Sequence, residues 1–144
     1  MAVTYKREAP PAPESDVARL EHRIRRSLPA DYRAYLLNQD GGRPITNDKA
    51  VKEIFGIRED APDWANMWDK LDIFHGRYPA WLLPVAQDEY GNLFALSLRE
   101  QDFGSVWFWD HEEEADEGEP PSEDNIEKWA DSWTEFLASL QPAG

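Results

Sequence analysis

The stretch that decides the fold runs from Leu82 to His111 and reads LLPVAQDEYGNLFALSLREQDFGSVWFWDH. It contains three apolar runs, Leu82–Ala86, Leu93–Leu98 and Val106–Trp109, separated by two segments that combine Gly with Asp and Glu. Short apolar runs bounded by such residues are typical of strands joined by hairpins. The pattern therefore predicts a three-stranded antiparallel meander that the rest of the chain covers.

Turn residues punctuate this meander and the segment before it. An Asp side chain can accept backbone N–H bonds within a turn, and Gly supplies backbone conformations that other residues rarely adopt. We expect six residues to have this structural role rather than a chemical one: Gly41, Gly42, Asp88, Gly91, Asn92 and Gly104.

Apolar residues at steps of three and four predict about four helices around the sheet, including one near each end of the chain. The helices are expected over residues 15–28, 30–38, 63–74 and 122–140. The expected N-caps are Ser15 or Asp16 for the first helix, Asp63 for the third and Ser122 for the last. Edge strands are expected around Ile45–Ile57. The predicted fold class is α+β, with a central antiparallel sheet flanked by helices.

The domain organisation is expected to be simple. Residues 1–14 contain three prolines and little apolar content, which favours a disordered lead-in. Residues 15–141 are expected to form a single domain with an acidic loop at 110–125. A chain of 144 residues is long enough to bury a substantial core.

The charge is strongly negative and unevenly distributed. The chain has 29 acidic and 15 basic side chains, for a net charge of −14. Residues 110–127 contain ten of the acids and no Lys or Arg, so the remaining chain is nearly balanced. Such a field repels nucleic acid and anionic membranes, and it attracts a basic partner.

Aromatic residues at the end of the meander raise two alternatives. Alternate strand residues face opposite sides, so Trp107 and Trp109 share a face that carries no charged residue. Either helices and loops cover both faces, or one of these tryptophans is partly exposed beside the acidic loop as an anchor for a partner. The candidate partner-binding residues are Trp107, Trp109, Asp110, Glu112, Glu113, Glu114, Asp116 and Glu117.

The chain offers few residues for site chemistry. It lacks Cys, and its three His residues stand in no spaced metal motif. Asp110 and His111 could hold a divalent cation weakly, but a solvated acidic loop is the simpler interpretation. The arginines at 19, 23, 25 and 26 form either a solvated helix face or a cradle for the chain's own acidic segment or an acidic ligand. We expect no enzyme activity and no cofactor. Without an apolar run of about 20 residues or a signal peptide, we expect a cytoplasmic protein.

Four blocks of the sequence together resemble the SMI1/KNR4 (SUKH) family. They are Leu28-Pro29-Ala30-Asp31-Tyr32 continuing to Gly41-Gly42; Leu83–Ala86 with Asp88, Gly91-Asn92 and Leu96; Gly104, Val106 and Asp110-His111; and Ala130, Ser132-Trp133 and Phe136-Leu137. Trp133 departs from the more usual Phe. The resemblance implies an α+β fold, no catalytic residues and binding of other proteins. The acidic loop and the proline-rich start lie outside the shared pattern.

This resemblance favours one function and leaves two others open. Many bacterial members look like immunity proteins that neutralise toxins, often nucleases, which suggests a basic toxin domain as the partner. Fungal members resemble regulatory scaffolds of cell-wall signalling, which is the alternative. A small-ligand or metal-binding domain is the third hypothesis.

Overall fold

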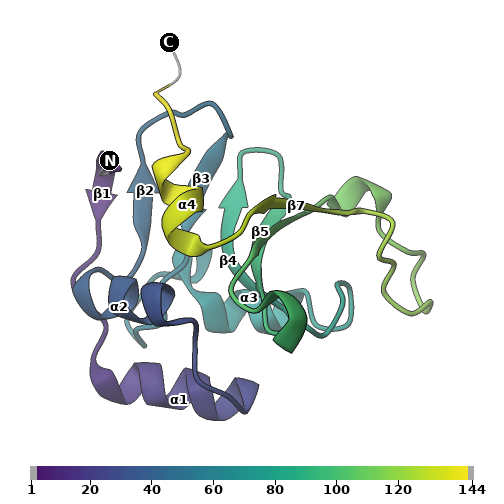
Figure 1. Ribbon diagram of the computed structural model, residues 1–144, viewed down its shortest axis with the longest axis horizontal. Coiled ribbons are helices and arrows are strands. Elements are labelled where there is room, and N and C mark those ends of the chain that lie inside the picture. The colour runs from purple at the N-terminus through teal and green to yellow at the C-terminus, as the bar shows by residue number, and fades with distance from the viewer. Residues whose placement is uncertain (1–2, 143–144) are drawn as a thin grey trace.

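The computed structural model describes residues 3–142, in which seven strands form one antiparallel sheet whose spatial order follows the chain from β1 to β7 (Figure 1). The strands are β1 (Tyr5–Glu8), β2 (Gly42–Pro44), β3 (Val51–Ile54), β4 (Leu82–Asp88), β5 (Leu93–Ser97), β6 (Val106–Trp109) and β7 (Ile126–Ala130). The helices are α1 (Glu14–Ile24), α2 (Ala30–Asn38), α3 (Met67–Ile73) and α4 (Trp133–Ala138), with short 3₁₀ turns η1 (Asp63–Ala65), η2 (Glu100–Asp102) and η3 (His111–Glu113). The predicted α+β class is confirmed.

The predicted meander is confirmed as β4, β5 and β6 at the centre of the sheet. Leu83 is paired with Leu96, and Phe94 is paired with Phe108, so apolar side chains from three strands share one face. None of the helices within residues 3–142 is long and apolar enough to cross a membrane.

Helices and loops lie on both faces of the sheet and bury Trp109, as the first of the two alternatives required, whereas Trp107 stays partly exposed, as the second allowed. On one face, Phe94 contacts Phe136 of α4 at 5.1 Å between ring centroids. On the other, Trp109 contacts Phe74, which follows α3, at 5.8 Å, and Tyr78 at 6.4 Å. We call these the α4 face and the α3 face.

The predicted final helix over residues 122–140 is wrong in its first half. Residues 126–130 form β7, and α4 begins only at Trp133. Trp129 in β7 and Phe136 in α4 both contact Phe94, so two elements on one face produced the spacing of a single helix. Residues 126–130 form a strand because they pair with β6, whose outer backbone groups would otherwise lack strand partners.

The start of α4 has a sequence signal of its own, which the continuous apolar spacing obscured. Ser132 is the N-cap, and its hydroxyl accepts the backbone N–H of Glu135 at 3.1 Å. The Glu135 carboxylate reaches back to accept the backbone N–H of Asp131 at 3.1 Å. The pattern Ser-x-x-Glu is the capping box, whereas Ser122 only caps a bend through the N–H of Asp124.

Four further predictions are corrected in the first half of the chain. The N-cap of α1 is Pro13 rather than Ser15 or Asp16. Residues 5–8 of the expected disordered lead-in form β1, which pairs with β2, while residues 1 and 2 lie outside the described residues. Asp63 opens the turn η1 instead of α3, whose N-cap is Asn66. Because β1 and β7 are the edges, β2 and β3 are interior strands rather than edge strands.

The Gly41-Gly42 turn leads the chain from α2 into the sheet, and its backbone passes very close to the backbone of β3. Gly41 has φ of +80°, and a Cβ there would lie 2.3 Å from the carbonyl oxygen of Ile54. Beside it, buried Asp40 accepts the backbone N–H groups of Ile57 at 2.8 Å and Arg58 at 3.0 Å. The turn therefore needs a residue without a side chain.

Replacing Gly41 with Ala should lower the free energy of unfolding by at least about 3 kcal/mol, because left-handed strain of roughly 1–2 kcal/mol adds to displacement of β3. Gly118 is the control, since its φ is +88° and a Cβ added there would meet no atom within 4 Å. Gly118→Ala should lose only the strain contribution of roughly 1–2 kcal/mol. Denaturant unfolding of both variants measures the difference, and equal losses would contradict the close approach.

Candidate partner-binding surface

The acidic segment leaves the sheet after β6 and returns to it as β7, forming a loop that projects from that end of the molecule (Figure 1). Arg77 ties its middle to the body: Nε donates to Glu114 Oε2 at 3.0 Å, and Nη2 donates to Oε1 at 2.5 Å. This pairing raises the pKa of Arg77 and holds the pKa of Glu114 below its usual value. Glu114 therefore has an internal partner.

The first residues of the loop are tied to the turn between β4 and β5. The backbone N–H of His111 donates to Asn92 Oδ1 at 3.1 Å, and His111 Nε2 lies 2.8 Å from the carbonyl oxygen of Tyr90. Asp110 Oδ1 accepts the N–H of Glu112 at 3.0 Å. Within the turn, Asp88 Oδ1 accepts the N–H groups of Tyr90 and Asn92 at 2.8 and 2.9 Å.

Five carboxylates of the loop point outward and form what we call the acidic surface: Glu112, Glu113, Asp116, Glu117 and Glu119. All five residues are exposed. Within residues 3–142, none of their side chains has a hydrogen bond or an ion pair, in contrast to Glu114 and Asp110. The acidic surface therefore keeps its full negative charge available to solvent and to a partner.

Trp109 is not available to a partner, which corrects its place among the candidate residues. It is 1% exposed, its ring contacts Phe74 and Tyr78, and the Arg77 guanidinium lies 5.8 Å from the ring. Because side chains cover the α3 face at this point, Trp109 is part of the core although it directly precedes the acidic loop.

Trp107 is partly exposed and belongs to a small cluster beside the loop. Its ring meets that of Trp81 edge-on at 5.3 Å, and its Nε1–H donates to Ser105 Oγ at 2.8 Å. The Arg99 guanidinium stacks on Trp81 at 3.5 Å. Bonding to Asp102 raises the pKa of Arg99 and lowers the pKa of Asp102, so this cluster is ordered from within.

Two adjoining hollows lie between the loop and the body. One, of about 710 Å³, is lined by residues 75–77 and by loop residues 114–119 with Pro121. The other, of about 640 Å³, is mostly apolar and includes Tyr78, Pro79 and Trp81. They share His75, Gly76 and Pro121. Glu114, Asp116 and Glu117 were among the predicted partner-binding residues, whereas His75, Tyr78 and Trp81 were missed, although the Tyr-Pro-x-Trp run at 78–81 directly precedes the meander.

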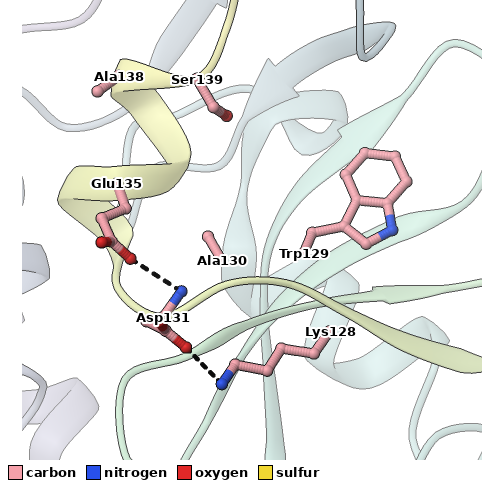
Figure 2. Close-up of a pocket in the computed structure, with 7 residues that line it drawn as sticks. All are labelled: Lys128, Trp129, Ala130, Asp131, Glu135, Ala138 and Ser139. Carbon is pink, nitrogen blue, oxygen red and sulfur yellow. Dashed lines mark hydrogen bonds and ion pairs between the residues drawn. The ribbon is translucent and has the colours of Figure 1, made fainter.

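A shallower hollow of about 590 Å³ lies where β7 turns into α4 (Figure 2). Its charged groups are paired with each other: Lys128 binds the Asp131 carboxylate, and Glu135 accepts the Asp131 backbone N–H (Figure 2). Trp129 is stacked on Phe108 at 4.8 Å. The bond to Glu135 belongs to the start of α4. Because the charged groups bond to each other, few are left to bind a ligand.

Arg19 and Arg23 of α1, and Arg26 just after it, contact groups outside the acidic loop and do not cradle it. Arg19 pairs with Glu59 at 2.9 Å, Arg23 lies 3.8 Å from Asp72, and the Arg26 guanidinium is 3.7 Å from the Phe103 ring. None of these three partners belongs to the acidic loop. In the described part of the chain, no group of three or more His, Asp or Glu side chains is arranged to hold a metal ion.

The chain matches a model of a known protein family. Residues 11–139 match the model of the SMI1/KNR4 family, also called SUKH-1. No curated protein matches the chain. The matched range runs from just before α1 to the end of α4 and includes the acidic loop.

Replacing Glu114 with Gln should release the loop while leaving the core intact. The bidentate pair with Arg77 is lost, so amide hydrogen exchange over residues 112–119 should accelerate severalfold. Glu113→Gln is the control, because it removes the same charge from an exposed side chain without an ion pair. Equal acceleration in both variants would mean that Arg77 does not hold the loop.

The same pair predicts a pH dependence. Because Arg77 lowers the pKa of folded Glu114, the pair stabilises the docked loop above the ordinary Glu pKa of about 4.3. That stabilisation is lost as the pH falls through the lowered value. The Arg77 Nε–H resonance should therefore move in acid in the wild type. In Glu114→Gln, this resonance should already have, at neutral pH, nearly the chemical shift that the wild type reaches in acid, and it should change little as the pH falls.

Proposed function

The chain belongs to the SMI1/KNR4 (SUKH-1) family, and from this premise we propose that it is a non-enzymatic immunity protein that neutralises a basic bacterial toxin by direct binding. The partner would be a protein domain with a cationic surface, such as that of a nuclease. The observation that carries the proposal is the acidic surface, whose five carboxylates lack partners of their own within the described residues.

The charge supports rapid and selective association. A cluster of exposed acids in a protein of net charge −14 steers a cationic partner toward one end of the sheet. The same field disfavours nucleic acid, which a nuclease would otherwise hold at its basic site. Blocking that site would need stoichiometric binding rather than chemistry.

The loop's attachment supports the proposal in a second way. Arg77 and the turn at 88–92 hold the loop at its start and middle, so less conformational entropy is lost on binding. The apolar hollow beside it is lined by Trp81, whose ring contacts partly exposed Trp107, and it provides a place for an apolar side chain of the partner. An apolar centre with a charged rim is the usual arrangement of a protein-binding hot spot.

Co-expression with a panel of basic toxin nuclease domains tests the proposal. One toxin should be neutralised and should co-purify with the chain. Replacing Glu112, Glu113 and Glu117 with Gln and Asp116 with Asn should slow association at least about tenfold at low salt.

A matched control separates the local effect from net charge. Glu8→Gln, Asp63→Asn, Glu89→Gln and Glu100→Gln remove four charges from exposed residues outside the loop and should leave association nearly unchanged. Toxin binding that persists unchanged in the loop variant would remove the acidic surface from the interface. A housekeeping partner with no protection against any toxin would instead favour a regulatory scaffold.

A further inference from the structure

A basic pocket lies where η1 and α3 meet β2, β3 and β4, away from the β6–β7 end of the sheet that carries the acidic loop. Its volume is about 370 Å³, within the range of small-molecule sites. It is lined by Arg43, Lys52, Glu53, Trp64, Lys70 and Gln87, which come from β2, β3, η1, α3 and β4. No residue of the acidic loop contributes to it.

Part of the basic pocket is explained by the fold alone. Glu53 in β3 is 3% exposed and accepts hydrogen bonds from Arg7 of β1 and Arg43 of β2. Burial raises the pKa of Glu53, and the two guanidinium groups oppose that rise. A buried carboxylate requires such partners, so these three residues form a cross-strand ion cluster.

The two lysines are not explained by that cluster. Within residues 3–142, Lys52 has no hydrogen bond or ion pair, and the nearest acid to Lys70 is Asp69 at 3.9 Å. Three cations, Arg43, Lys52 and Lys70, therefore line the pocket against one acid, Glu53, which already bonds Arg43 and, outside the lining, Arg7. A local excess of cations stands out in a protein of net charge −14.

Trp64 is the second feature without a packing explanation. It is 49% exposed, although indole rings are usually well buried. The guanidinium groups of Arg7 and Arg43 lie 4.9 and 5.6 Å from the centre of its ring, within cation–π range. The Gln87 amide adds a donor that has no hydrogen-bond partner in the described residues.

We propose that this basic pocket binds the phosphate group of a small molecule. Arg43 offers a planar pair of N–H donors, and Lys52 and Lys70 offer point charges on either side, a combination suited to a compact dianion. Trp64 forms the wall against which the carrier of the phosphate lies. The pocket shares no residue with the acidic surface, so phosphate binding can be tested separately from toxin binding.

Titration of the full chain followed by ¹H–¹⁵N NMR tests the site, with inorganic phosphate and phenyl phosphate as separate probes against sodium chloride of equal ionic strength. Saturable shifts should concentrate at Lys52, Trp64, Lys70 and Gln87. Tighter binding of phenyl phosphate would indicate a monoester ligand, and equal binding would indicate free phosphate.

Substitutions supply the decisive comparison. Lys52→Gln should weaken phosphate binding about tenfold, and Lys70→Gln should do the same if it retains the wild-type spectrum. Lys6→Gln is the control, since Lys6 is an exposed lysine on β1 that does not line the pocket. Shifts that never saturate, or equal weakening by Lys6→Gln and Lys52→Gln, would overturn the proposal.

Discussion

The packing of Phe94 is the interaction on which the rest of the structure depends. Its ring contacts Phe108, Trp129 and Phe136 at 5.6, 5.2 and 5.1 Å, so one side chain joins β5, β6, β7 and α4. Removing such a buried ring typically costs about 3–5 kcal/mol. Because β6 and β7 are held side by side, the chain between them must leave and re-enter at one end of the sheet. The position of the acidic loop thus follows from an apolar contact.

Covering both faces of the sheet also decides where binding can occur. Helices and loops cover most of the α4 and α3 faces, so partners can reach the connecting loops and the part of the sheet beside η1 that stays open. The charges are divided between these surfaces, with the acidic surface beyond β6 and the basic pocket across β2 to β4. The family's Asp31 has a role in the scaffold, since its carboxylate accepts the backbone N–H and the hydroxyl of Thr134 at 2.9 Å and docks α4 against α2.

Prediction succeeded where the pattern is local and failed where a distant partner decides. The strands of the meander could be recognised because Gly and Asp residues bound each short apolar run. Trp129 and Phe136 could not be assigned, because a spacing of seven residues fits one helix as well as a strand followed by a helix. Trp109 was misplaced for a related reason: alternation shows which residues share a face, and only the fold shows that Phe74 and Tyr78 cover it.

By itself the sequence determined the α+β class, the meander, the family resemblance and the concentration of acid in residues 110–127, because each depends on residues close together in the chain. The tertiary structure alone decided that Glu114 is neutralised by Arg77 while its neighbours stay unpaired. It also decided that Trp109 is core, and that Arg43, Lys52 and Lys70 meet beside Trp64. These outcomes depend on pairing and burial between segments far apart in sequence, and such interactions leave no periodic pattern in either segment.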